Sequence, residues 1–212
     1  MDRILAAAEE LIARGVFDRA TVSGLVKRAD TSVGAFYSRF KDKKALESVL
    51  QERFVGRIEA EVAKLTDSAR WLGQPFVTVV HGVVTGLVEL LRRERGGFRS
   101  LVCGSIGRGR SVAARARRID QAIGQGVEGL FQRFAGEIVH PRPTVAVGIG
   151  LAMVVGAVRE RFAYGADDLL PERLDSGDLV AELAAVYLAY LQGSAAIPAP
   201  STTASDLPTP RS

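Results

Sequence analysis

The apolar residues of this chain recur with the period of an α-helix almost as far as residue 192. The first helical face contains Ile4, Leu5, Ala8, Leu11 and Ile12. A half-buried β-strand would instead alternate apolar and polar residues, and the hairpin dipeptides Asn-Gly and Asp-Gly do not occur in the sequence. The periodicity therefore predicts an all-α fold.

Nine helices are expected from this periodicity and from the residues that begin and end helices. Their approximate ranges are 2–15, 22–29, 32–40, 42–65, 74–93, 97–106, 111–136, 144–163 and 177–192. Prolines at 141, 143 and 171 fall between these ranges and Pro75 falls in the first turn of one, where a missing N–H costs little. From Gly193 the sequence is rich in Ala, Pro, Ser and Thr, which predicts a disordered tail over 193–212. Recruitment of a partner by this proline-rich tail is the alternative.

Composition limits the classes of function. The one cysteine, Cys103, excludes an intramolecular disulfide framework, which fits a reducing compartment, and no metal site is expected because His81 and His140 are far apart in sequence. The longest apolar run, Thr144 to Val158, is shorter than the roughly 20 residues that span a bilayer, and the charged start is unlike a signal peptide. We expect a cytoplasmic protein without membrane contact.

Enzymatic activity is not expected. Nucleophilic catalysis needs a nucleophile next to a base, and Cys103 with either histidine is the only such pairing, outside any motif. We therefore expect neither a reaction nor a cofactor.

Three short helices within the first 46 residues are typical of a helix-turn-helix unit. The positions that must face inward are apolar: Val22, Leu25, Val26, Ala29, Phe36 and Phe40. Short residues from Thr31 to Ala35 begin the third helix and would let it approach a groove in DNA. Groups able to bind phosphate surround it, namely Thr21, Tyr37, Arg39, Lys41, Lys43 and Lys44.

The order of residue types in this region resembles the DNA-binding domain of the tetracycline-repressor-like (TetR) family of bacterial transcription regulators. The resemblance covers residues 3–50. It is carried by Ala20-Thr21-Val22-Ser23 and by the run from Ala29 to Leu46, above all Phe36-Tyr37-x-x-Phe40 followed by Lys43 and Leu46. It implies a helix-turn-helix DNA-binding domain over 1–46 and an effector-binding and dimerisation domain over 47–192.

The resemblance also implies a set of DNA contacts. Thr21 would cap its helix and touch a phosphate, Ser23 would point towards DNA, and Ser32 would cap the recognition helix. Base edges would be faced by Val33, Gly34, Ala35 and Ser38, and the DNA backbone would be held by Tyr37 and Lys43. Because Val33 and Ala35 have no side-chain hydrogen-bonding groups, they could read only thymine methyl groups or DNA shape. Arg39 could grip a guanine or contact a phosphate, and both alternatives stay open.

The sequence departs from the family pattern in two places. Asp30 stands where the family has glycine in the turn, and aspartate tolerates a left-handed conformation better than most residues, so we expect the turn to survive. Few residues precede the first helix, so no basic arm for the minor groove is expected unless residues are missing upstream.

Two apolar helices near the end of the chain predict a homodimer. Residues 144–161 are apolar on all sides, and Gly148, Ala152 and Gly156 form a row of small side chains that permits close approach. The helix at 178–192 has a stripe of Leu179, Leu183, Val186 and Tyr190, with Val180, Tyr187 and Leu191 beside it. Two such helices from each subunit would form a four-helix interface, as the resemblance also implies, and a monomeric buried core is the alternative. A two-fold dimer favours a palindromic operator.

The effector is less well defined. Apolar residues that could be core or could line a pocket are Phe76, Val80, His81, Val84, Leu87, Leu101, Phe131 and Phe134, with His81 interpreted as a satisfied core histidine. The stretch 92–118 has nine arginines against Glu94 alone and includes a glycine-rich segment at 104–109. It could be a solvated rim, a contact with DNA phosphates, or a site for an acidic effector such as an acyl-CoA.

Together these features predict a ligand-responsive transcriptional regulator. We expect a repressor that binds double-stranded operator DNA as a dimer and is released by a small apolar or amphipathic effector. The alternative is a helical ligand-binding or scaffold protein that has lost specific DNA binding.

Overall fold

The computed structural model describes residues 2–103, 110–164 and 174–193, and within these ranges the chain contains helices and no strands. The nine α-helices of the described ranges are α1 Asp2–Ala13, α2 Val22–Arg28, α3 Val33–Tyr37, α4 Lys43–Leu65, α5 Phe76–Arg93, α6 Arg95–Cys103, α7 Arg110–Phe131, α8 Pro143–Arg159 and α9 Ser176–Gln192. The predicted all-α fold is confirmed. No helix in the described part is long and apolar enough to cross a membrane.

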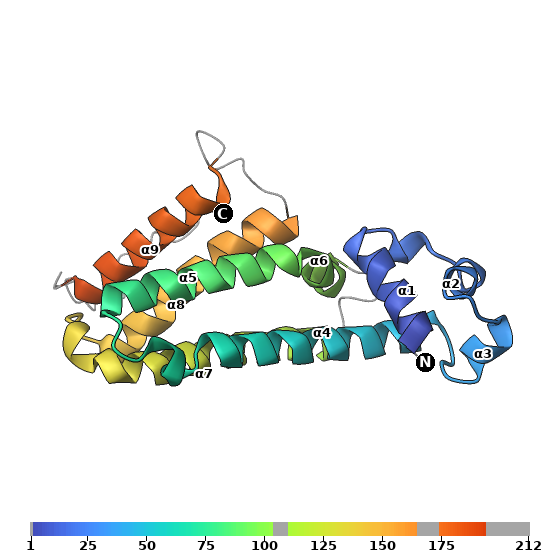
Figure 1. The fold of residues 1–212 in the computed structure, drawn as a ribbon, viewed down its shortest axis with the longest axis horizontal. Helices are drawn as coiled ribbons and strands as arrows, with labels where there is room; N and C mark the ends of the chain where they lie inside the picture. The colour runs from blue at the N-terminus through green and yellow to red at the C-terminus, as the bar shows by residue number, and fades with distance from the viewer. Residues whose placement is uncertain (1, 104–109, 165–173, 194–212) are drawn as a thin grey trace, which may run out of the picture.

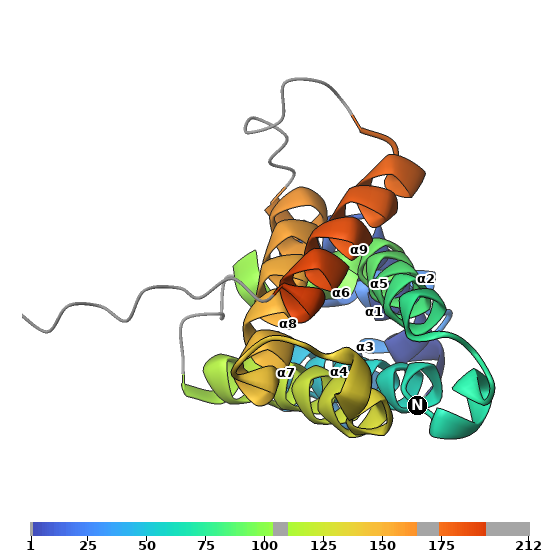
Figure 2. The same ribbon diagram turned by 90° about the vertical axis from the view of Figure 1, so that its left-hand side faces the viewer.

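The molecule is elongated, with α1, α2 and α3 at one end and α5, α8 and α9 at the other (Figure 1). The long helix α4 begins beside α1 and runs along most of the length of the molecule. Seen from the end, α4 and α7 lie side by side, with α5, α8 and α9 stacked over them (Figure 2). α6 lies between the two ends and packs against α1, α4 and α5.

The buried apolar residues form two separate cores. The first joins α1, α2 and α3 to the start of α4 and ends at Leu50. The second begins at Phe54 and contains the rest of α4 together with α5, α6, α7, α8 and α9. Because α4 is continuous across both cores, the division of the chain at residue 46 stays a prediction.

The helix boundaries differ from the predicted ones in a few places. α3 ends at Tyr37, so Phe40 lies beyond the helix, although it is 4 % exposed and belongs to the first core. α6 begins at Arg95, directly after α5, and α7 ends at Phe131, where the chain continues as the 3-10 helix Gln132–Glu137. The predicted tail beyond 193 and the glycine-rich segment 104–109 lie outside the described residues.

The prediction for His81 was wrong. The face of α5 that packs into the core carries Val79, Val80, Val83 and Val84, so His81 falls on the opposite side and is exposed. The buried histidine is His140, which is 5 % exposed and packs on Tyr190 with ring centroids 4.9 Å apart. Its Nδ1 accepts a hydrogen bond from the backbone N–H of Arg142 at 3.1 Å.

Most of the other candidate pocket residues are core. Phe76, Val80, Val84, Leu87 and Phe131 are each no more than 1 % exposed in the second core. Phe134 is half-buried and stacks on Phe76 at 5.2 Å, and the side chain of Leu101 lies outside the described part.

Candidate nucleic-acid interface

The starts of α2 and α3 are fixed by local hydrogen bonds that short side chains supply. Thr21 Oγ1 accepts from the backbone N–H of Gly24 at 3.1 Å, and Ser32 Oγ accepts from Ala35 at the same distance. Each bond satisfies one of the donors left unpaired at a helix N-terminus, so both residues are N-caps as predicted. The two caps define where both helices begin.

Asp30 occupies the left-handed conformation that the turn requires. Its φ is +48°, which confirms that the turn survives without glycine. Arg3 of α1 donates to the Asp30 carboxylate at 2.8 Å and to the Asp30 carbonyl at 3.0 Å. The aspartate therefore also ties the turn to α1, which a glycine could do only through its carbonyl.

One side of α3 is fixed to the first core. Phe36 is fully buried and lies 5.5 Å from Phe40, ring centroid to centroid. Leu25 and Val26 of α2 are buried in the same core. These contacts set the rotation of α3 about its axis, and hence which side chains face solvent.

The opposite side carries the predicted DNA contacts, and none of them is buried. Eight are exposed: Thr21, Ser23, Ser32, Val33, Gly34, Tyr37, Ser38 and Arg39. Ala35 and Lys43 are half-buried. Tyr37 is 56 % exposed, and its ring meets the Phe36 ring edge-on at 5.2 Å. The ten residues lie on or next to α2, α3 and the start of α4, and we call them together the α3 face.

Lys43 has a structural role that sequence reasoning missed. Its Nζ donates to the carbonyls of Phe17 at 2.7 Å and Asp18 at 2.9 Å, and lies 4.7 Å from the centroid of the Phe17 ring. Lys43 therefore holds the 3-10 helix η1 (Phe17–Arg19) against α4. An ammonium group has three N–H donors, so one remains for a phosphate.

A charged pair also holds α2 on α1. Arg28 donates to both carboxylate oxygens of Glu10, at 2.6 and 3.0 Å. These hydrogen bonds lower the pKa of Glu10 below its ordinary value. The helices that carry the α3 face are thus fixed by polar contacts on their exposed side as well as by their apolar core.

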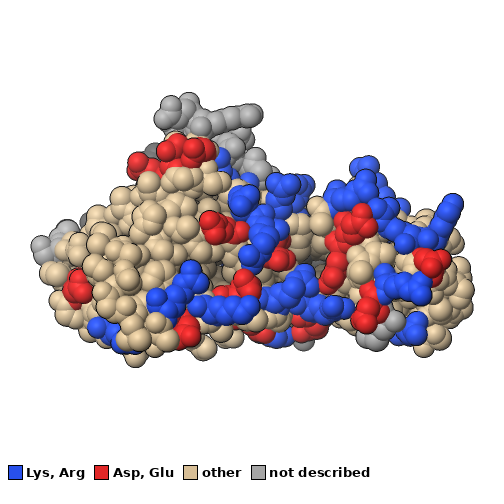
Figure 3. Space-filling view, viewed as in Figure 1, with Lys and Arg blue, Asp and Glu red and all other residues tan. Residues whose placement is uncertain are grey.

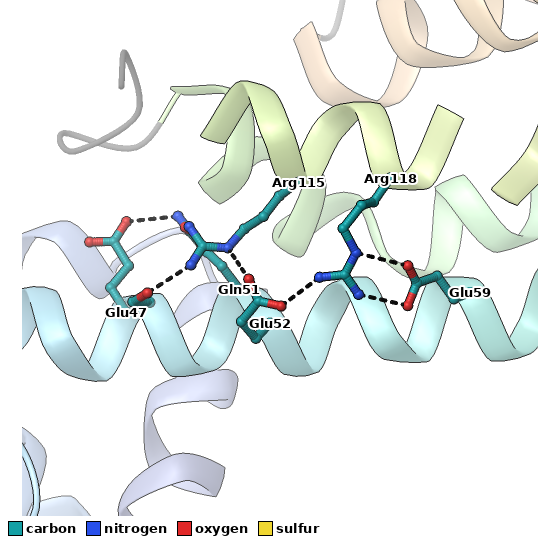
Figure 4. A network of polar contacts seen from close by, with 7 residues as sticks. Glu47, Gln51, Glu52, Glu59, Arg115 and Arg118 are labelled. Atoms are coloured by element: carbon teal, nitrogen blue, oxygen red, sulfur yellow. Dashed lines mark hydrogen bonds and ion pairs between the residues drawn. The ribbon is translucent and has the colours of Figure 1, made fainter. Parts of the chain in front are cut away.

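The arginine-rich stretch has an intramolecular role that the sequence pattern did not predict. Arg115 of α7 reaches α4, where it donates to Glu52 at 2.6 Å, Gln51 at 3.0 Å and Ser48 at 2.7 Å (Figure 4). Glu47 lies beside this group, 3 % exposed, and accepts a hydrogen bond from Gln51 at 3.3 Å. Burial raises the pKa of the Glu47 carboxyl above its ordinary value.

Arg118 extends the same network. It donates to both carboxylate oxygens of Glu59, at 3.0 and 2.9 Å, and to Glu52 at 2.7 Å (Figure 4). Hydrogen bonds from Arg115 and then Arg118 lower the pKa of Glu52. On α5, Arg93 donates to Glu61 at 2.9 Å. Basic and acidic side chains accordingly alternate along the middle of the molecule (Figure 3).

A second exposed surface lies on α8 and α9. Val145, Ile149 and Met153 of α8 are 40 to 49 % exposed, and Val186 of α9 is 50 % exposed. Gly148, Ala152 and Gly156 lie on the same exposed face of α8. We call these residues the α8–α9 face. The other side of α9 is buried, with Tyr187 donating to the Val147 carbonyl at 2.9 Å.

Comparison with known proteins agrees with this arrangement. The family model described as "Bacterial regulatory proteins, tetR family" matches residues 4–47. A search of curated proteins gives no significant match. The structural matches extend over nearly the whole chain.

Three solved structures illustrate the likeness. A protein from Mesorhizobium loti described as a TetR-family transcriptional regulator is 16 % identical, with 90 % of this chain and 94 % of that chain covered and a TM-score of 0.66. A transcriptional regulator from Rhodococcus is 21 % identical, with 90 % and 94 % covered and a TM-score of 0.62. The fatty acid degradation regulator FadR from Bacillus halodurans is 16 % identical, with 91 % and 98 % covered and a TM-score of 0.60.

These comparisons and the helix-turn-helix geometry lead to one assignment. Residues 4–47 match the tetR family of bacterial regulatory proteins, and the described chain has the fold of solved structures described as regulators of that family.

Proposed function

We propose that the protein is a cytoplasmic transcriptional repressor that binds a palindromic operator as a homodimer and is released by a small effector. The observation that carries this proposal is the α3 face. The buried Phe36 fixes the rotation of α3 about its axis, so that the short and polar side chains of α3 face solvent. A helix presented in this way fits the major groove, which is wide enough to admit it.

The residues of the α3 face suit two kinds of DNA contact. Tyr37 and Lys43 have donors at the edge of the face and suit phosphates, which fix register on the duplex. Val33, Gly34 and Ala35 suit close approach to base edges. Arg39 is exposed and has no ion pair with any described residue, so its five donors are available to guanine or phosphate.

The α8–α9 face supports a homodimer. A Cβ added at Gly148 or Gly156 would meet nothing within 4 Å, so neither glycine is required by packing inside the protomer. At Gly150, on the other side of α8, a Cβ would lie 2.3 Å from the Tyr187 ring. Packing inside the protomer therefore does not require these two glycines, and the exposed Ile149 and Met153 lie on the same helix. Small residues here would let the same helix of a second copy approach closely.

An apolar or amphipathic effector is the ligand class we propose. Of the solved structures with this fold, one is described as a fatty acid degradation regulator and another, from Clostridium perfringens, as a fatty acid metabolism regulator. A cavity of about 400 Å³ beside the second core, lined in part by Trp71, Leu130 and Phe134, offers apolar surface to such a ligand. Release then follows if the effector binds more tightly to a dimer whose recognition helices are spaced wrongly for the operator.

DNA binding is tested by fluorescence anisotropy on duplexes from beside the protein's own gene, at several salt concentrations. Tyr37→Ala should weaken binding to every sequence and reduce the salt dependence if the tyrosine contacts phosphate. Arg39→Ala should do the same if Arg39 contacts phosphate, or should relax specificity at one position at a cost of roughly 1–3 kcal/mol if it reads guanine. Arg117→Ala, which removes an exposed arginine of α7, is the control and should leave binding unchanged.

Weak binding that depends on neither variant nor sequence would contradict the proposal. A selection from random sequences then separates an operator located elsewhere from a scaffold protein that has lost DNA binding. Enrichment of a palindromic sequence would support a regulator whose operator lies elsewhere, and no enrichment would favour a scaffold protein.

The dimer is tested by sedimentation equilibrium of an Ile149→Asp variant. Because Ile149 is 49 % exposed in the protomer, the change should spare the fold and dissociate the dimer. Val77→Asp is the matched control, since Val77 of α5 is also about half exposed, at 53 %, but lies off the α8–α9 face. A dimer unaffected by the Ile149 change would refute this interface.

A further inference from the structure

Two cavities lie where α1 meets α6, between the helices of the two cores. The first has a volume of about 280 Å³ and faces α4. Its charges are paired: Arg57 lies 2.8 Å from Glu9 and 3.7 Å from Glu94, and Arg93 lies 3.8 Å from Glu94. Apart from Arg95, which lines both cavities, this cavity therefore offers little unbalanced charge to a ligand.

The second cavity is larger, about 440 Å³, and we call it the junction cavity. It is enclosed by the end of α1, η1, α6 and the π-helical turn η4 (Glu160–Tyr164). Arginines from three of these segments line it: Arg14 from the end of α1, Arg95 and Arg99 from α6, and Arg161 from η4. Basic side chains gather over this part of the molecule in the surface view (Figure 3).

Two of the arginines that line the junction cavity have no acidic partner among the described residues. Asp18 is the only acidic residue among those that line it. Neither Arg95 nor Arg99 makes an ion pair or side-chain hydrogen bond with any residue of the described ranges. Arg14 forms a long ion pair with Glu10, at 3.9 Å.

Arginines brought together in this way suit an anion. The guanidinium group is always charged and presents a planar fork of donors that matches carboxylate and phosphate oxygens. Several cations around one concave site also concentrate field and raise the local density of anions. The cavity volume lies within the range usual for small-molecule sites, roughly 300–1,000 Å³.

We propose that the junction cavity binds a small ligand carrying phosphate or carboxylate groups, and that this ligand alters operator affinity. The proposal rests on the DNA-binding function proposed above. A ligand in the cavity touches both Arg14, directly after α1 of the first core, and Arg99, on α6, which packs in the second core through Phe98. The binding free energy of the ligand therefore depends on how α1 packs on α6. If the ligand changes operator affinity by some factor, thermodynamic linkage requires operator DNA to change ligand affinity by the same factor.

The test uses inorganic pyrophosphate as the probe and the full chain in calorimetric titrations. The double variant Arg95→Gln, Arg99→Gln should bind pyrophosphate at least about tenfold more weakly than the parent, which corresponds to roughly 1.4 kcal/mol. The control, Arg92→Gln with Arg117→Gln, removes two exposed arginines outside the cavity and should bind it as the parent does. Arg14→Gln, at the exposed end of α1, is a second variant should the first fail to fold.

A second arm measures operator affinity with and without pyrophosphate. Pyrophosphate should change the operator affinity of the parent and of the control, but not that of the Arg95→Gln, Arg99→Gln variant. Equal pyrophosphate affinity in all variants would overturn the proposal. So would a junction variant that binds DNA more weakly and with a smaller salt dependence in the absence of pyrophosphate, because the arginines would then contact the DNA backbone. Because calorimetry requires no DNA, failure of the anion site and failure of DNA binding are read separately.

Discussion

Replacement of Gly96 by alanine tests the contact between the two cores. Gly96 lies in the first turn of α6, and a Cβ there would be 2.9 Å from the Cα of Ala13 and 2.9 Å from the carbonyl oxygen of Ile12. Both atoms belong to the backbone at the end of α1, so no side-chain rotation can relieve the clash. The glycine is what allows α6 to lie directly on α1.

The size of the effect follows from these distances. Ordinary carbon–carbon contacts are about 3.5–4.0 Å, so α6 must move away by roughly 0.6–1 Å. Overpacking of this kind costs about 1–3 kcal/mol, whereas the gain in helix propensity from glycine to alanine is at most about 1 kcal/mol and smaller in a first turn. We expect a net loss of about 1–2 kcal/mol.

Urea unfolding followed by circular dichroism measures this loss. The matched control is Gly124→Ala in the middle of α7, where a Cβ would meet nothing within 4 Å. That change should increase stability by about 0.5–1 kcal/mol, so the two identical substitutions have opposite signs. If Gly96→Ala increased stability as Gly124→Ala does, the close approach of α6 to α1 would be refuted.

Three further changes probe buried and paired polar groups, each followed by urea unfolding. Tyr187→Phe removes the hydrogen bond to Val147 and should cost about 0.5–1.5 kcal/mol; no loss would mean that this bond is not made. Because burial raises the pKa of Glu47, stability falls as pH rises past the ordinary carboxyl value; Glu47→Gln should be more stable than the parent at about pH 7 but not below about pH 4. The pKa of Glu52 is lowered by its bond to Arg115, so its contribution is present at neutral pH and is lost as pH falls through the lowered value. Glu52→Gln should therefore cost at most about 1 kcal/mol at neutral pH, because the pair is partly exposed, and nothing in acid; a constant loss at all pH values would contradict this.

The helix-turn-helix could be predicted from sequence because its determinants are local. The caps at Thr21 and Ser32 act on residues three positions away, and the burial of Phe36 follows from helical spacing. Even the left-handed Asp30 follows from a property of its own side chain. Where a feature depends on neighbours within one turn, residue order is enough to predict it.

Contacts between segments far apart in the sequence could not be predicted in this way. The partners of Lys43 are two backbone carbonyl groups. Every residue type has such a group, so the sequence does not identify these two as partners. His81 was placed in the core because it lies among valines, but an apolar segment does not say which side of a helix faces inward. The partners of Arg115 are 63 to 67 residues away on α4, so a count of charges in its own segment could not reveal them.

The junction cavity shows the same limit most clearly. Its arginines come from residues 14, 95, 99 and 161, and only Arg95 and Arg99 stand in the arginine-rich stretch 92–118. Other members of that stretch, Arg93, Arg115 and Arg118, pair with carboxylates of α4. Charge density along the sequence therefore could not separate the arginines that α4 neutralises from those that line the cavity, because density does not show where the matching acidic residues lie. The arginines of the cavity meet where the end of α1 and η4 converge on α6, and only the fold brings these segments together.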